Sequence, residues 1–169
     1  MLEIAQASAP DDVAATRDLI RELTSWAISL DPETKDAPAF GDLEKELAAL
    51  PGVFAPPTGC LLLAKDDGRP IGCVGFCAHS ASDGADEVEV KRMYVLPDQR
   101  GKGVGKELVA RLIAQAQLMN VRRIVLDSYH TMTGAHRIYR AAGFRDVPAP
   151  LDFPERWASR VVFMELDLD

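Results

Sequence analysis

One segment near the middle of the chain constrains the fold most strongly. Residues 87–95 alternate charged and apolar side chains, which predicts a strand with one solvated face. From residue 103 to 119, apolar side chains recur at steps of three and four, which predicts an amphipathic helix. The connection between them holds three glycines, Gly101, Gly103 and Gly105. A glycine-rich connection from a strand into a helix favours a mixed α/β domain.

The remaining pattern also alternates between strands and helices. Further apolar runs bounded by turn residues predict strands, and helical spacing predicts further helices. The other predicted strands span residues 2–7, 60–64, 70–79, 123–127 and 160–168. The other predicted helices span residues 8–30, 42–50 and 133–142, and loops are predicted at 31–39, 54–59 and 80–84. We expect one mixed α/β domain over residues 1–169.

Composition excludes several classes of protein. The chain has 169 residues, 47% of them hydrophobic and 27% charged, which suits one domain with its own core. The chain holds no apolar run long enough for a membrane span, and its acidic start lacks the basic cluster of a secretory leader. Three cysteines, Cys60, Cys73 and Cys77, do not make a disulfide framework. We therefore expect a cytoplasmic protein with structural thiols.

The formal net charge of −7 lies entirely in the first fifty residues, which hold 11 acidic and 4 basic side chains. The rest of the chain is neutral. A negative field disfavours nucleic acid as a partner and favours a cationic one. The alternative is that two solvated helices simply carry many carboxylates.

The segment from Arg100 to Lys106 has the composition of an anion-binding loop. Its glycines allow successive amides to point the same way, and these amides open a helix whose first turn carries unpaired N–H groups. Arg100, Lys102 and Lys106 add positive charge, so we predict a diphosphate site. A P-loop does not fit because Glu107 stands where Ser or Thr is needed, and Lys106 breaks the dinucleotide fingerprint. A helix start without a ligand is the alternative.

Two motifs together resemble the GCN5-related N-acetyltransferase (GNAT) superfamily. The motif R-x-x-G-x-G at residues 100–105 is similar to the acetyl-CoA signature of that family. The motif A-x-x-x-Y-x-x-x-G-F at residues 135–144 resembles the family's later helix and turn. The similarity covers roughly residues 58–168. It implies an acetyl-CoA-dependent N-acetyltransferase with a mixed, mostly antiparallel sheet, a splay between two central strands, and helices on both faces.

The resemblance also implies a set of site residues. The phenol of Tyr139 would protonate or hydrogen-bond the departing CoA thiolate, and main-chain amides would hold the pyrophosphate and the pantetheine arm. The implied cofactor-binding residues are Met93, Tyr94, Val95, Arg100, Gly101, Lys102, Gly103, Val104, Gly105 and Lys106. A β-bulge near Tyr94 would leave the strand amides free. Met132 stands where many members carry asparagine, so one pantetheine contact of the family is not expected here.

An amine acceptor must lose a proton before it attacks, which costs about 4 kcal/mol at pH 7 for an ammonium of pKa about 10. Glu89 is the predicted general base, because family bases often lie on this strand. The alternatives are a water chain or one of Glu87, Asp127, Tyr129 and His130. Strand alternation puts Glu89 on the same face as Lys91, so an ordinary surface ion pair is the alternative role for Glu89.

The sequence therefore favours direct attack of a primary amine on acetyl-CoA in a ternary complex, with no acyl-enzyme and no metal. Cys73, Cys77 and His79 share one strand face, but their spacing is too long for a compact metal site. We expect a small-molecule amine or a peptide amine as the acceptor, and the negative charge favours a cationic small molecule. The alternatives are a non-catalytic CoA-binding module and a protein N-acetyltransferase. The sequence leaves open whether the chain forms a homodimer. For Trp26 the alternatives are the lining of an acceptor pocket and the core, and its helical spacing favours the core.

Overall fold

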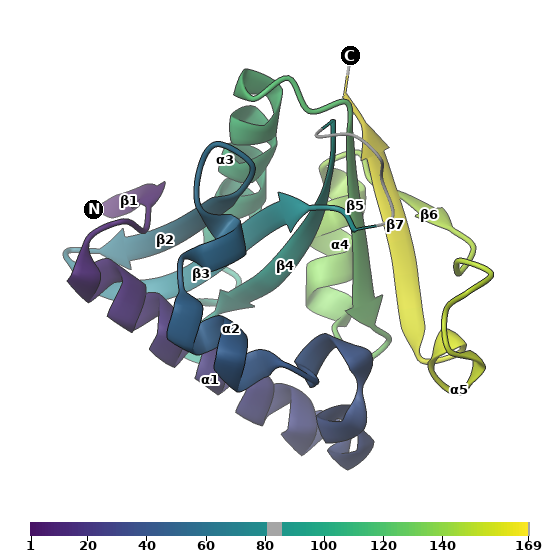
Figure 1. The fold of residues 1–169 in the computed structure, drawn as a ribbon. Helices are drawn as coiled ribbons and strands as arrows, with labels where there is room; N and C mark the ends of the chain where they lie inside the picture. Colours follow the sequence, from purple (N-terminus) through teal and green to yellow (C-terminus); the bar gives the residue numbers. More distant parts are fainter. Residues whose placement is uncertain (81–85, 169) are drawn as a thin grey trace.

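The computed structural model describes residues 1–80 and 86–168, and within these ranges seven strands form one sheet (Figure 1). Its order is β1-β2-β3-β4-β5-β7-β6, and only the β4–β5 pair is parallel. The strands are β1 (Leu2–Gln6), β2 (Cys60–Asp66), β3 (Arg69–Ala78), β4 (Glu87–Val95), β5 (Arg123–Tyr129), β6 (Arg145–Val147) and β7 (Val161–Asp167). The predicted mixed, mostly antiparallel sheet is confirmed.

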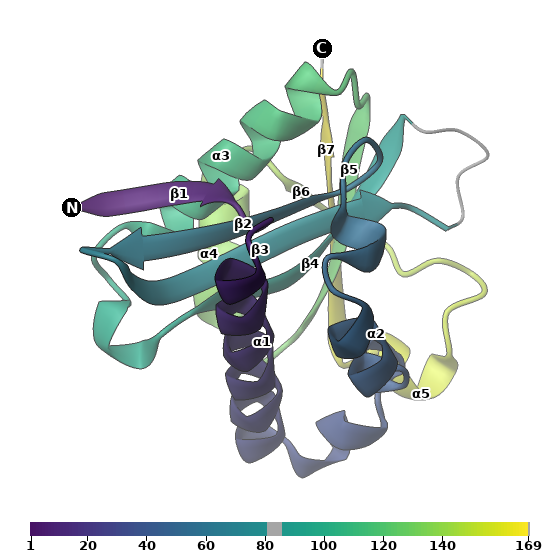
Figure 2. The same cartoon turned by 60° about the vertical axis from the view of Figure 1, so that its left-hand side comes forward.

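Helices cover both faces of the sheet, as Figures 1 and 2 show. On one face lie α1 (Pro10–Leu30) and α2 (Leu43–Ala49), and on the other lie α3 (Val104–Leu118) and α4 (Thr133–Ala141). The short α5 (Glu155–Ala158) precedes β7. The 3-10 helices are η1 (Pro32–Asp36), η2 (Pro38–Phe40), η3 (Gly52–Phe54) and η4 (Pro97–Gln99).

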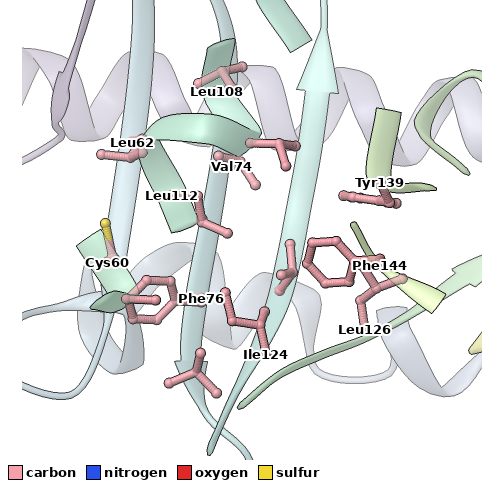
Figure 3. Packing of buried hydrophobic residues seen from close by; sticks show 14 of the residues in the cluster. Cys60, Leu62, Val74, Phe76, Leu108, Leu112, Ile124, Leu126, Tyr139 and Phe144 are labelled. Carbon is pink, nitrogen blue, oxygen red and sulfur yellow. The ribbon is translucent and has the colours of Figure 1, made fainter. Parts of the chain in front are cut away.

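Alternation along β3 divides the core between the two faces. Val74 and Phe76 are fully buried beneath Leu108 and Leu112 of α3 (Figure 3). Cys73 points the other way, into the cluster that α1 and α2 form with the sheet. Burying apolar side chains on both faces fixes the strand register, because a slip by one residue would exchange the two faces.

The central strands β4 and β5 separate soon after they meet. They pair only over residues 87–89 and 123–125, and then diverge (Figure 1). Between its pairs with Gly75 and Cys73 of β3, β4 carries one extra residue, and Arg92 there adopts a left-handed φ of 61°. This bulge bends β4 away from β5. The predicted splay is confirmed, and the bulge lies at Arg92 and Met93, next to the expected Tyr94.

Two short elements, β6 and α5, were not predicted. Residues 145–147 have no recognisable strand pattern, and they pair because β7 offers them an edge. Residues 31–39, predicted as a loop, form η1 and η2, each of which begins at a proline whose fixed φ suits a first helical position. The loop predicted at 80–84 lies outside the described residues except for Ser80.

Candidate active site

A cleft of about 340 Å³ lies where β4 and β5 diverge. Its floor comes from these two strands, and its walls come from α1 and η2 on one side and α4 on the other. The lining includes Glu89, Met93 and Tyr139 of the predicted site, together with Asp127 and Tyr129. Two other proposed bases, Glu87 and His130, are not among its lining residues. The divergence of β4 and β5 therefore places some of the candidate bases at the cleft and leaves the others outside it.

Beside this cleft, the loop before α3 presents free backbone amides. Within the described ranges, no hydrogen bond of good geometry uses the N–H groups of residues 101–106, although residues 100–103 form a turn, whereas the N–H of Arg100 donates to Pro97 O at 3.4 Å. Gly101 and Gly103 have φ of 76° and 87°, and a Cβ on either would meet nothing within 4 Å. Such a row of amides at the positive end of a helix fits a diphosphate.

Gly105 has a different role from the other two glycines. A Cβ at this position would lie 2.8 Å from Ile138 Cδ1 of α4 and 3.1 Å from Met93 Cε of β4. The missing side chain therefore lets the start of α3 pack closely against both elements. This contact holds the free amides beside the cleft.

The side chain of Arg100 does not extend along the free amides. Its Nε donates to Val95 O at 2.9 Å, and its guanidinium lies 4.0 Å from the Trp26 ring centroid and 5.5 Å from that of Tyr94. Arg100 thus ties α1 to the end of β4. Trp26 is half-buried, packs against the apolar cluster beneath α1 and also lines the cleft, so it combines the two places that the sequence left open. Helical spacing alone did not show that α1 passes over the splay.

The end of β4 offers main-chain groups to the opened edge. The amide of Leu96 donates to Ile71 O of β3 at 2.9 Å. Since successive amides of a strand point to opposite edges, those of Val95 and Met93 face away from β3, towards the splay. The amide of Tyr94 faces β3, and its ring is buried against α1. Three residues of β4 were predicted to bind the pantetheine arm. Of these, Met93 and Val95 have amides that face the side of the cleft, and Tyr94 does not.

Tyr139 projects from α4 at the edge of the core. It is 4% exposed, packs against Phe144 with ring centroids 5.6 Å apart, and still lines the cleft (Figure 3). Burial raises the pKa of its phenol. The hydroxyl therefore keeps its proton at neutral pH and is a hydrogen-bond donor.

Two carboxylates enter the cleft from adjacent strands. Glu89 of β4 lies 3.6 Å from His79 Nδ1 and 3.9 Å from Lys91 Nζ. Asp127 of β5 faces water in the cleft, but surrounding protein and the negative charge of Glu89 raise the pKa of its carboxyl. Both groups are carboxylates, so each can accept a proton from an acceptor bound in the cleft.

A buried ion pair holds the wall of the cleft to the bulge. Arg92, whose side chain is 7% exposed, donates to both carboxylate oxygens of Glu46 at 2.7 and 3.1 Å. It also donates to Ala39 O at 2.9 Å and lies 5.6 Å from the Phe40 ring centroid. These contacts fix α2 and η2 onto β4. No sequence motif indicates this pair, because its partners lie 46 residues apart.

Replacing Glu46 by glutamine is expected to lower the free energy of unfolding by about 3 kcal/mol, because it leaves the buried guanidinium without its counter-charge. Urea denaturation measures the change. Glu44→Gln on the same helix is the matched control, since that side chain is 78% exposed and lies 3.7 Å from Arg21. Its loss should be within about 0.5 kcal/mol. Equal losses in the two variants would contradict a structural role for the Arg92 pair.

The cysteines are poor nucleophiles. Burial raises the pKa of Cys60 to about 11 and that of Cys73 to about 12, and the pKa of Cys77 is also raised by burial. All three thiols are free and hold their protons at neutral pH. Within residues 1–80 and 86–168, no group of three His, Cys, Asp or Glu side chains could hold a metal ion. None of the described helices is both long and apolar enough to span a membrane.

The class of protein follows from three features, namely the splayed sheet, the open helix start and the acidic cleft. Together they are typical of α/β proteins that transfer acyl groups. Comparison with protein families gives a match to the Acetyltransferase (GNAT) family over residues 18–144. The chain belongs to this family and is an acetyltransferase, as the sequence motifs predicted.

Individual relatives agree with this assignment. The chain is 29% identical over 169 residues to an uncharacterised N-acetyltransferase of Schizosaccharomyces pombe, and the match covers 99% of this chain and 95% of that protein. It is 35% identical over 112 residues to N-acetylaspartate synthetase of Danio rerio, covering 66% of this chain and 39% of the relative. The fold matches PaiA N-acetyltransferase from Thermoplasma acidophilum, solved in complex with coenzyme A, with a TM-score of 0.70, 15% identity and 99% coverage of both chains.

Proposed function

We propose that this chain transfers an acetyl group from acetyl-CoA to a primary amine while both substrates are bound. One observation carries the proposal, namely that the free amides of residues 101–106 open beside a cleft that contains two carboxylates and a buried phenol. Acetyl-CoA supplies the activated thioester. The protonated state of Cys60, Cys73 and Cys77 supports direct transfer to the amine rather than an acyl-enzyme.

The amides of residues 101–106 hold the pyrophosphate, and Lys102 and Lys106 add positive charge there. Arg100 acts by joining α1 to β4. The amides of Met93 and Val95 receive the pantetheine arm along the opened edge of β4. Each of these groups binds without a large rearrangement, because a bulge and a helix start hold it in place.

Glu89 removes the proton from the acceptor ammonium, and Asp127 holds the positive charge of the acceptor before that step. Two separate roles are possible because both side chains line the same cleft from adjacent strands. Tyr139 donates its hydroxyl hydrogen towards the departing sulfur. Its raised pKa favours a strong hydrogen bond over complete proton transfer.

The acceptor that fits the cleft is a small cationic amine. Among the described lining residues, the carboxylates of Glu89 and Asp127 outnumber the single ammonium of Lys91, and Arg92 is already neutralised by Glu46. Aromatic rings of Trp26, Phe40 and Tyr129 provide further surface for a cation or its methylenes. The likeness to N-acetylaspartate synthetase makes L-aspartate the second candidate acceptor. We also place the protein in the cytoplasm, where free thiols stay reduced.

Acetyl-CoA turnover against a panel of acceptors tests the proposal. The panel contains diamines and polyamines, neutral and acidic amino acids including L-aspartate, and peptides with free N-termini. We expect kcat/KM for a diamine to exceed that for L-aspartate by about tenfold or more, because 1.4 kcal/mol of electrostatic preference gives that factor. Preference for aspartate or for peptides would reject a cationic acceptor. CoA binding without turnover of any amine would reject the proposed reaction.

A further inference from the structure

A histidine behind the cleft bridges two glutamates of β4. His79 follows the last residue of β3, and its amide donates to Glu87 O at 3.0 Å. Its Nε2 lies 3.6 Å from Glu87 Oε1, and its Nδ1 lies 3.6 Å from Glu89 Oε2. Each ring nitrogen thus faces a different carboxylate. Imidazole can accept a proton on one nitrogen and release one from the other.

These three side chains form a row that begins at the cleft, and their exposed fractions are 18% for Glu89, 25% for His79 and 23% for Glu87. Glu89 lines the cleft, whereas neither His79 nor Glu87 is among its lining residues. Glu87 lies 3.9 Å from Arg123 Nη1, and the side chain of Arg123 is 44% exposed. A proton that leaves Glu89 through His79 therefore moves away from the substrates and towards solvent.

We propose that His79 transfers the proton of the acceptor amine from Glu89 to Glu87, and that Glu87 releases it to water. This inference rests on the proposed role of Glu89 as the base. The ammonium N–H bond breaks and an O–H bond forms on Glu89. His79 Nδ1 then takes that proton while Nε2 gives its own to Glu87, so one proton leaves per turnover. Proton exchange with water, which reaches the ring because the His79 side chain is 25% exposed, then removes the proton from Nδ1 and returns one to Nε2.

The reaction needs such a route because every turnover leaves one proton in a cleft that two substrates fill. Both contacts of 3.6 Å are longer than hydrogen bonds, and catalytic contacts of this kind commonly shorten when substrate binds. Other charged groups also face the row. Lys91 lies 3.9 Å from Glu89, and Arg123 lies 3.9 Å from Glu87.

His79→Gln tests the relay, because glutamine keeps a polar side chain of similar reach but cannot pass a proton at neutral pH. With the best acceptor of the panel, we expect kcat at pH 7 to fall about tenfold to a hundredfold, with little change in acceptor KM. Added imidazole should restore kcat in proportion to its concentration. Glu87→Gln, at the outer end, should give a smaller loss that imidazole also relieves, and it serves if the histidine variant does not fold.

Glu89→Gln separates this inference from the proposed function. If Glu89 is the base, the kcat of this variant falls at pH 7 and approaches wild type near pH 10, where about half of the amine is already neutral. A Glu89 variant with wild-type kcat at pH 7 would overturn both the base and the relay. Loss of activity in the Glu89 variant, with unchanged kcat in the His79 and Glu87 variants, overturns the relay alone. A rise in acceptor KM that imidazole does not relieve would make His79 a positioning residue.

Discussion

Glutamate in place of Gly103 is expected to abolish CoA binding measured by calorimetry. Gly103 has φ of 87° at the start of α3, a conformation that costs a non-glycine residue about 1–3 kcal/mol. The new carboxylate would also stand among the amides proposed for the pyrophosphate. Two like charges about 4 Å apart near a protein surface repel by about 4 kcal/mol, which corresponds to about a thousandfold in affinity.

Gly68→Glu is the matched control for this substitution. Gly68, in the turn between β2 and β3, has φ of 81°, and a Cβ there also meets nothing within 4 Å. The control carries the same backbone strain and the same added charge away from the loop before α3. We expect it to bind CoA like the wild type, with a comparable loss of stability. Unchanged affinity in the Gly103 variant would reject the proposed pyrophosphate site.

Removing the hydroxyl of Tyr139 with phenylalanine is expected to lower kcat about a hundredfold, with CoA affinity and folding close to wild type. The ring stays packed against Phe144, so the core keeps its shape, and only the donor is lost. Steady-state kinetics with the acceptor saturating gives the comparison. The hydroxyl assists the departing sulfur, so its loss should affect kcat rather than acceptor KM.

A second thioester, with a different leaving group, serves as the control for Tyr139→Phe. An acetyl thioester of an aromatic thiol releases a more stable thiolate, which needs less help from a hydrogen-bond donor. We therefore expect the loss caused by Tyr139→Phe to become smaller with that substrate. A loss of the same size for both thioesters would indicate that Tyr139 supports the fold of the cleft, and near-normal turnover with acetyl-CoA would remove it from the mechanism.

Local pattern was sufficient for the parts of the site that lie within one segment. The glycine spacing at residues 101–105 predicted open amides at a helix start, and the structure places six free amides there. The alternation of residues 87–95 predicted that Glu89 and Lys91 share a face, and both line the cleft. Backbone conformation and strand parity depend on neighbours in the sequence, so the chain itself carries this information.

Contacts between distant segments could not be predicted in this way. Arg100 was expected to place its charge at the phosphate loop, but it stacks on Trp26, for which helical spacing favoured the core. Arg92 and Glu46 form a buried pair that no motif indicated. Each pair joins a helix of the first fifty residues to β4 or to the loop after it. Such partners are set by how helices pack on the sheet.

The sequence by itself determined the fold class, the family and the glycine-rich start of α3, because periodicity and glycine placement encode local backbone geometry. The tertiary structure decided which acids meet in the cleft. β4 and β5 pair over residues 87–89 and then diverge at a bulge, and this brings Glu89 and Asp127 to one space while it leaves Glu87 behind His79. A register and a bulge are properties of paired strands, so neither strand alone could specify that arrangement.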